Sequence, residues 1–134
     1  MNIKQIMTSP VLTVSLDDDL AKVNEIFSEA KFHHLLVVEK RKLFGVVSDR
    51  DLLKAISPKI GTAAEKLADT ASLNKKVHQI MTRKLICLQQ NNSVHDAINV
   101  FLQNNISCIP VVDSNDFPVG VVSWRDILNA IKKT

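Results

Sequence analysis

The sequence predicts an α/β fold of the α+β kind, made of two tandem repeats, and three observations support this prediction. The first is a motif, Gly45–Asp51 (GVVSDRD), that recurs as Gly120–Asp126 (GVVSWRD). The second is an Ile-Met-Thr triplet that ends at Thr8 and again at Thr82. The third is the order of the apolar segments, which in both halves indicates strand, helix, strand, strand, helix. One repeat buries too little surface to be stable alone, so we expect the two to pack through their sheets with pseudo-twofold symmetry.

The composition is that of a folded domain without long charged or apolar runs. Hydrophobic residues make up 46% of the 134 residues and charged residues 23%, whereas aromatic residues are only 4%, so we expect an aliphatic core. The net charge of +3 comes from scattered Lys and Arg, which suits small anionic ligands at least as well as nucleic acid. The longest aliphatic run, Leu35–Val38, is far too short to span a membrane, and residues 1–14 do not resemble a signal peptide.

The two cysteines, Cys87 and Cys108, are both flanked by apolar residues. This usage favours two small buried thiols over a redox pair, and it is typical of a reducing compartment. The sequence therefore predicts a cytoplasmic protein with two buried, unpaired cysteines.

The repeated motif has a direct physical interpretation as a buried strand that runs into a helix. Valine pairs favour extended backbone, and the serine is a good helix N-cap. The aspartate three residues later lies in the first turn, where the helix dipole favours negative charge. A single copy would be only a capping box, but two copies define a repeat.

In the first repeat, strands are expected at residues 11–14, 35–38 and 43–47, with a charged turn at 39–42. The carboxylates of Asp17–Asp19 should start a helix whose apolar stripe has helical spacing. A second helix should follow Ser48 and end before Ser57-Pro58. The residues expected on these two helices' apolar faces are Leu20, Val23, Ile26, Phe27 and Ala30, and then Leu52, Leu53 and Ile56.

The second repeat has the same order. Strands are expected at residues 85–88, 109–112 and 119–122, with a turn at 113–116, and Ser93 should cap the first helix. Between the repeats, Thr62–Glu65 resembles a capping box that opens a short surface helix towards Asn74, with Leu67 and Ala71 on its thin apolar side. The predicted organisation is repeat 1 over residues 1–57, a linker over 58–76 and repeat 2 over 77–134. The helix faces expected to be apolar are formed by Val94, Ala97, Ile98 and Phe101, and by Ile127, Leu128 and Ile131.

Taken in order and twice over, these motifs resemble the tandem CBS-domain pair, also called a Bateman module. The resemblance covers Ile3 to Ile131, nearly the whole chain. It implies a regulatory module that binds adenosine-containing ligands, such as AMP, ADP, ATP or S-adenosylmethionine, in clefts between the repeats. It also implies a stand-alone protein that pairs into a homodimer and acts on a partner protein that the sequence does not identify. No catalytic cofactor and no membrane or nucleic-acid partner is implied.

The resemblance also assigns two ligand-binding sites. In this family the serine and aspartate of the motif contact the ribose, which suits the chemistry, because a carboxylate accepts from two vicinal hydroxyls and a serine both donates and accepts. The adenine lies against the first strand of the opposite repeat, and phosphates meet the residues before the buried strand. The first site then comprises Val46, Ser48, Arg50, Asp51, His33, His34, Thr82, Leu85 and Cys87, and the second comprises Val121, Ser123, Asp126, Thr8, Val11 and Thr13.

The two sites are expected to differ. The second has Ser107 and Cys108 where the first has the two histidines, and Trp124 where the first has Asp49. Arg83, next to Thr82, is expected to add charge to the first site. We therefore expect AMP or ATP to prefer the Asp51 site.

Other interpretations of these residues were weighed. An arginine in a first helical turn, such as Arg50, is more often solvated than bound to phosphate. His33 and His34 lack further ligands at zinc spacing, so no metal site is predicted, and no nucleophile accompanies them as an enzyme would require. The strongest rival hypothesis is a constitutive dimer that docks a partner without a working ligand site. A homodimer is expected in either case, because the helices should present Leu52, Leu53, Ile127 and Leu128.

Overall fold

The computed structural model describes residues 1–133, which form two compact units that do not coincide with the two repeats. Unit 1 comprises Met1–Val11, Arg41–Leu43 and the chain from Lys84 onwards. Unit 2 comprises Leu12–Lys40 and Phe44–Arg83. Each unit therefore combines most of one repeat with the Ile-Met-Thr segment of the other.

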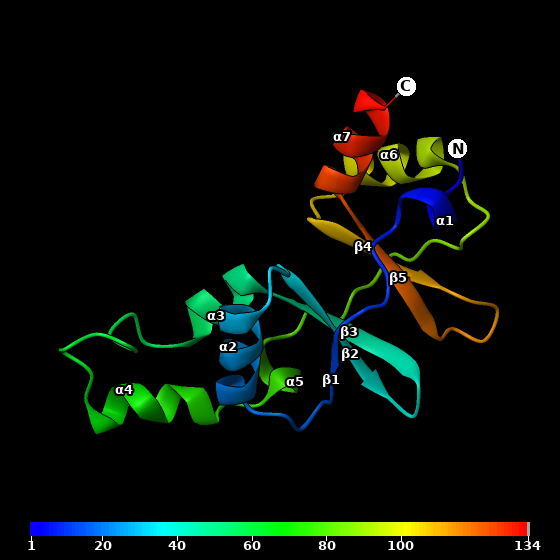
Figure 1. Ribbon diagram of the computed structural model, residues 1–134. Coiled ribbons are helices and arrows are strands. Elements are labelled where there is room, and N and C mark those ends of the chain that lie inside the picture. The colour runs from blue at the N-terminus through cyan, green and yellow to red at the C-terminus, as the bar shows by residue number, and fades with distance from the viewer. Residues whose placement is uncertain (134) are drawn as a thin grey trace. The chain divides into compact units, whose positions relative to one another are not determined.

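Unit 2 is built on a three-stranded sheet in the order β1-β2-β3, with α2 and α3 lying together beside it (Figure 1). Strands β1 and β2 are parallel, with Thr13 opposite Leu36. The core of the unit is aliphatic, as expected, and contains the fully buried Leu35, Val37 and Val47. The elements of this half of the chain are β1 (Thr13–Val14), α2 (Leu20–Glu29), β2 (His34–Glu39), β3 (Lys42–Ser48), α3 (Asp49–Ala55), α4 (Leu67–Ala71), the 3-10 turn η1 (Ser72–Asn74) and α5 (Val77–Ile80).

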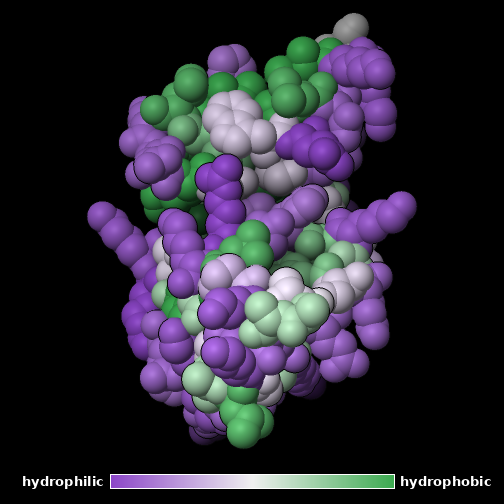
Figure 2. Space-filling view, turned by 90° about the vertical axis from the view of Figure 1, so that its left-hand side faces the viewer, coloured by the Kyte–Doolittle hydropathy of each residue, from purple (hydrophilic) through white to green (hydrophobic). Residues whose placement is uncertain are grey.

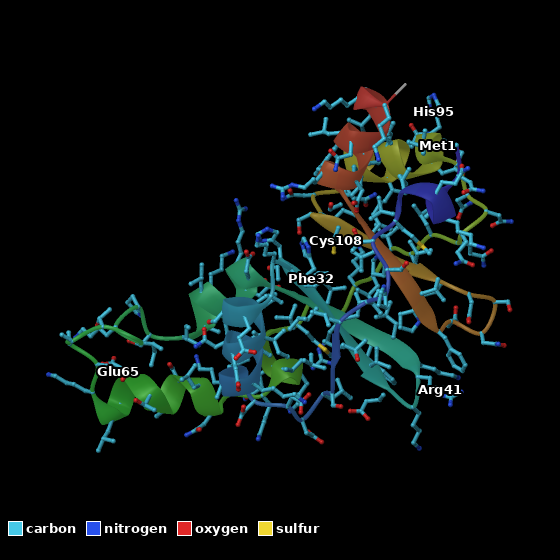
Figure 3. All side chains as sticks on the ribbon, in the orientation of Figure 1. Met1, Phe32, Arg41, Glu65, His95 and Cys108 are labelled. Carbon is cyan, nitrogen blue, oxygen red and sulfur yellow. The ribbon has the colours of Figure 1, made fainter. Side chains whose placement is uncertain are left out.

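The two longer helices of unit 2 begin at the N-cap residues that the sequence predicts. The Asp19 carboxylate accepts from the Lys22 N–H and caps α2, and the Ser48 hydroxyl caps α3. Lys40 and Arg41 both have positive φ, which is the backbone of a tight two-residue hairpin between β2 and β3. Figure 3 shows Arg41 at the tip of this hairpin.

Unit 1 has a two-stranded antiparallel sheet, β4-β5, with the last helix following directly from β5. Ser93 caps α6 through a full capping box, and the core contains Ile109, Val111, Val122 and Ile127. Asp116 has positive φ in the turn between the strands. The elements are α1 (Ile3–Ile6), α6 (Val94–Gln103), β4 (Cys108–Val112), β5 (Pro118–Ser123) and α7 (Trp124–Lys132).

The prediction of a strand at residues 85–88 is wrong. Only Leu88 forms a bridge, to Val111, through two backbone hydrogen bonds of 3.0 Å and 2.9 Å. The corresponding β1 forms two paired positions with β2. A single bridge is too short to count as a strand, so the sheet of unit 1 has two strands instead of three.

The short helices α1 and α5 occupy corresponding places in the two units. In unit 2 the Val77 N–H donates to the Asp18 carbonyl at 2.8 Å, at the start of α2. In unit 1 the Ile3 N–H donates to the Asn92 carbonyl at 2.8 Å, at the start of α6. Val77 and Ile3 are both fully buried. The segment preceding each Ile-Met-Thr triplet is thus anchored on the capped end of a helix from the other repeat.

The linker helix begins later than predicted. It starts at Leu67, where the Asp69 carboxylate accepts from the Lys66 N–H, whereas Thr62 caps a turn by accepting from the Ala64 N–H. The Glu65 carboxylate reaches back to the Gly61 N–H, one residue before the expected partner. Leu67 is 91% exposed and Ala71 is also exposed, so the expected apolar side of this helix is wrong.

The surface predictions are partly wrong. Leu52 and Ile127 are buried inside their own units, because each faces the sheet beside it, and cannot cover a partner. Leu53 and Leu128 are 70% and 62% exposed. Figure 2 shows hydrophobic surface gathered on unit 1, whose exposed large apolar residues include Leu102, Trp124, Leu128 and Ile131. Among residues 1–133, no helix is long and apolar enough to cross a membrane.

Candidate functional site

In unit 2, the repeated motif brings a serine and a carboxylate together at the start of α3. The Ser48 N–H donates to Asp51 Oδ2 at 2.9 Å, and the Asp51 N–H donates to Ser48 Oγ at 3.0 Å. Beside them Val46 and Thr82 exchange two backbone hydrogen bonds of 3.1 Å and 2.9 Å. The predicted grouping of Val46, Ser48, Asp51 and Thr82 is thus present within one compact unit.

Within residues 1–133, Asp51 and Ser48 keep most of their hydrogen-bonding capacity. An ionised carboxylate offers about four acceptor positions, and Asp51 uses one for the Ser48 N–H. The Ser48 oxygen accepts from Asp51, but its own O–H proton has no partner in the described chain. These groups match what a vicinal diol requires, which is two acceptors and one donor.

The two histidines lie at the start of β2, where Figure 3 marks the preceding residue, Phe32. His33 Nδ1 is 2.9 Å from Asp49 Oδ2, and the Asp49 N–H donates to the His33 carbonyl at 3.0 Å. His34 is half-buried. Burial lowers the pKa of His34 and nearby His33 lowers it further, whereas the charges of Asp49 and Asp51 oppose the shift. At neutral pH His34 is therefore mainly an uncharged imidazole.

The two arginines predicted to supply charge differ in what they contact. Arg50 is exposed in the first turn of α3. The Arg83 guanidinium donates to the His78 carbonyl at 2.7 Å, at the end of α5. Arg83 therefore supports its own segment, and Arg50 is the solvated cation of this site.

In unit 1, the second copy of the motif has the same helix cap but a fuller hydrogen-bond set. Asp126 Oδ2 accepts from the Ser123 N–H at 2.8 Å and from the Ser123 hydroxyl at 3.2 Å. The Thr8 hydroxyl also donates to this carboxylate, at 3.1 Å from Oδ1. Thr8 is held in place by two backbone hydrogen bonds with Val121, of 2.8 Å and 3.1 Å. Three donors therefore already reach Asp126.

Trp124 takes the position that Asp49 has in unit 2. Its ring packs on Phe101 of α6, with the ring centroids 4.6 Å apart and tilted by 31°. Trp124 remains 40% exposed. At the start of β4, Ser107 and the buried Cys108 stand where unit 2 has its histidines (Figure 3). Where unit 2 has two histidines and Asp49, unit 1 thus has Ser107, Cys108 and the aromatic Trp124, next to the exposed Arg125.

Three of the remaining predicted site residues lie in a different unit from their carboxylate. Leu85 and Cys87 belong to unit 1 and Thr13 to unit 2, so their assignment to the Asp51 and Asp126 sites, respectively, stays a prediction. Val11 is half-buried at the end of its unit 1 segment.

The burial predicted for both cysteines is correct for Cys108 and wrong for Cys87. Neither cysteine is in a disulfide, but Cys87 is exposed because it lies outside the paired strands. Partial desolvation and the charge of Asp116 raise the pKa of the Cys87 thiol above its ordinary 9.0. Cys87 is therefore accessible but mostly protonated at neutral pH.

Two contacts of these sites were missed from the sequence. Asp49 was noted only as the counterpart of Trp124, but its carboxylate is the partner of His33. Thr8 was expected to face the ligand, but its hydroxyl is bonded to Asp126. The spacing of Asp49 to His33 across a strand pair could have suggested the first contact. Nothing local to Thr8 points to the second, which joins residues 118 positions apart.

Among residues 1–133, no group of three or more His, Cys, Asp or Glu side chains could hold a metal ion.

A CBS-domain family model matches residues 3–58 and again residues 77–133. The chain belongs to the CBS-domain family. The two matched ranges each contain one Ile-Met-Thr triplet and one glycine-serine-aspartate motif, so the two-repeat CBS prediction is confirmed.

Relatives of different lengths share these CBS domains. The chain is 31% identical to protein MJ1426 of Methanocaldococcus jannaschii, over 98% of this chain and 91% of that protein. It is 30% identical to protein MJ1404 of the same organism, again over 98% of this chain but over only 44% of that protein. The matched region thus makes up most of one relative and less than half of the other.

Solved structures confirm the predicted fold class. The CBS domain pair of protein MJ0100, in complex with 5′-methylthioadenosine and S-adenosyl-L-methionine, is 26% identical, with a TM-score of 0.79 over 99% of this chain and 97% of that one. CBSX2, solved in complex with AMP, is 22% identical with a TM-score of 0.81 and shows the shared fold.

Proposed function

We propose that this protein is a non-catalytic regulatory module that binds an adenosine-containing ligand at the Ser48–Asp51 site of unit 2. The observation that carries the proposal is the open hydrogen-bonding capacity there, because Asp51 accepts from one donor and the Ser48 hydroxyl proton has no partner in the described chain. A ribose diol would place its two hydroxyls on the Asp51 carboxylate, and Ser48 would donate to one of the hydroxyl oxygens. The adenosine-containing ligands of the MJ0100 pair support the same ligand class.

At the other end of this site, His33 and Arg50 would meet a phosphate. His33 is exposed and paired with Asp49, so a protonated His33 can exchange this carboxylate for a phosphate oxygen. AMP, ADP and ATP are the ligands that these cations suit best. The neutral His34 would contribute a hydrogen bond without charge.

Regulation would follow from the way the site is assembled. Thr82 and Val46 come from different repeats, and ligand binding at Asp51 would stabilise their pairing. A ligand can shift a conformational equilibrium only through its different affinities for the two states. We infer that the ligand changes the relative stability of states that a partner protein distinguishes, and that the protein acts as a homodimer in the cytoplasm.

A thermal melting screen of adenine and guanine nucleotides tests this proposal. An adenine ligand at about 100 times its Kd adds about 2.7 kcal/mol to the free energy of unfolding, which raises the melting temperature by several degrees. Guanine nucleotides should have a smaller effect at equal concentration. No rise with any adenosine compound would refute the ligand-binding proposal.

The alternative is a ligand-independent dimer that docks a partner. The exposed apolar side chains of α7, Trp124, Leu128 and Ile131, favour this alternative. A dimer by light scattering at tens of micromolar, together with a flat melting screen, would support it. A monomer in the same experiment would contradict the homodimer in both versions.

A further inference from the structure

The carboxylate of Asp126 already accepts three hydrogen bonds from residues of unit 1. Its donors are the Ser123 N–H, the Ser123 hydroxyl and the Thr8 hydroxyl. With about four acceptor positions on a carboxylate, one position remains. A vicinal diol that donates both of its hydroxyls needs two, so it cannot bind Asp126 until one of these donors leaves.

Thr8 is the donor that can leave. The Ser123 N–H belongs to the cap of α7, and the Ser123 side chain accepts from the Asp126 N–H in the same cap. The Thr8 hydroxyl comes from a different segment and is exposed, and it takes no part in that cap. Its backbone stays fixed by Val121 while its side chain rotates. Breaking the Thr8 contact therefore costs one exposed hydrogen bond and leaves the helix start intact.

We propose that the Thr8 hydroxyl is a built-in competitor that occupies Asp126 in place of a ligand hydroxyl and so sets the affinity and the diol selectivity of the unit 1 site. This inference rests on the proposed function for the ligand class, an adenine nucleoside or nucleotide with an intact ribose. It assigns Thr8 a role opposite to that of a ligand contact. With Thr8 in place, Asp126 accepts one ribose hydroxyl and distinguishes ribose from 2′-deoxyribose weakly.

Unit 2 provides the internal comparison. Thr82 has the same backbone pairing with Val46 that Thr8 has with Val121. Yet within residues 1–133 the Thr82 hydroxyl makes no hydrogen bond to Asp51, which accepts from Ser48. A threonine hydroxyl that competes for the carboxylate is therefore present only in the unit 1 site, and Thr82→Val removes no hydrogen bond to Asp51.

Trp124 gives a readout specific to the unit 1 site. It is the sole tryptophan of a sequence that has no tyrosine, and it follows Ser123 directly in the chain. Its ring is 40% exposed. Titrating the full-length protein with AMP and with 2′-deoxyAMP, while following tryptophan fluorescence, reports binding next to Asp126. Calorimetry of the same samples reports both sites together.

In the test, Thr8→Val keeps the side-chain shape and removes the donor. We expect it to tighten AMP binding at Trp124 by roughly two- to tenfold, the equivalent of one hydrogen bond, with a smaller gain for 2′-deoxyAMP. Thr8→Ser keeps the donor and should restore wild-type affinity and selectivity. Thr82→Val should give no tightening at the unit 2 site.

Weaker or unchanged AMP binding in Thr8→Val, or an equal gain for both ligands, would overturn the inference, since a ligand contact or a merely structural role would give those results. A fluorescence response that survives Asp126→Ala would also overturn it. These results differ from those expected if the proposed function itself is wrong. If the protein binds no adenosine ligand, calorimetry would show no binding that depends on Asp51 either.

Discussion

The two copies of the motif have the same helix cap and differ in what remains available for a ligand. Asp51 accepts from one donor within the described chain, and Asp126 accepts from three. The two additional donors to Asp126 are the hydroxyl of Ser123 and the hydroxyl of Thr8, which lies near the other end of the sequence. A motif therefore fixes the position of a carboxylate, whereas the residues around it decide how much of that carboxylate is free.

The largest expected effect is on binding. Asp51→Ala should weaken AMP binding by roughly ten- to hundredfold, because a charged hydrogen-bond partner is worth about 1.5–3 kcal/mol. Asp126→Ala should weaken total binding much less, since three internal donors already compete with the ligand there. Isothermal titration calorimetry measures both.

Asp51 also caps a helix, so this prediction needs a matched control. Asp96 forms the same box with Ser93, with distances of 2.8 Å and 3.1 Å, in α6 and outside both sites. Asp96→Ala should lower the melting temperature as the loss of a cap does, while AMP affinity stays as in the wild type. Equal losses of affinity from Asp51→Ala and Asp126→Ala would remove the asymmetry between the sites.

The next effect concerns the glycines that precede the two motifs. A Cβ on Gly45 would lie 2.6 Å from Met81 Sδ and 3.0 Å from the Thr82 carbonyl oxygen, whereas the three atoms nearest to a Cβ on Gly120 all belong to the Met7 side chain. Met81 is buried and Met7 is half-buried, so Met7 can move aside more easily. Gly45→Ala should lower the free energy of unfolding by about 1–3 kcal/mol, and Gly120→Ala by less. Urea denaturation measures both, and the reverse order would contradict this account.

The smallest effect is a pH dependence of the stability that arises from His34 in unit 2, since unit 1 has no histidine at the corresponding position. The pKa of His34 is lowered in the folded protein, so the unfolded chain binds the proton more tightly, and stability rises with pH. Stability should be lost as the pH falls below about 6.5, the unfolded value. Melting between pH 7.5 and 5.0 should show this loss, and His34→Gln should reduce it. A slope unchanged by that substitution would show that His34 does not contribute.

Adenosine, which has no phosphate, tests the role of His33 in ligand binding. If His33 contacts the phosphate, His33→Gln should weaken AMP binding by roughly two- to tenfold, the equivalent of one hydrogen bond, and leave adenosine binding unchanged. Isothermal titration calorimetry measures both ligands. An equal effect on AMP and adenosine would exclude His33 from the phosphate end.

The sequence was sufficient to predict the parts of the fold that depend on local chemistry. Ser48, Ser93 and Ser123 cap helices as predicted, because an N-cap needs only a serine and the three residues after it. The buried strands around Leu36 and Val111 were equally clear from their apolar runs. The fold class followed from the order of these elements in both repeats.

The features that depend on distant contacts were missed. The exposure of Cys87 reflects how far a sheet extends, and its apolar neighbours gave no sign of this. The sequence offers a capping box at Thr62 and Glu65, but α4 starts at Leu67, where the Asp69 carboxylate accepts from the Lys66 N–H. The bond between Thr8 and Asp126 requires two ends of the chain to meet. The site residues that the resemblance implies stay a prediction, whereas the structure shows which of their atoms are already bonded.

The exchange of Ile-Met-Thr segments between the repeats has a consequence for the order of folding during synthesis. All of unit 2 lies within residues 12–83, so its contacts can form once Arg83 has left the ribosome. The first eleven residues pack with chain from Lys84 onwards and must wait for partners such as Asp126. Contacts that join residues so far apart form slowly, because closing a long loop costs entropy before any packing is gained. Until then the apolar Ile3 and Ile6 stay unprotected on the nascent chain, as candidates for chaperone capture.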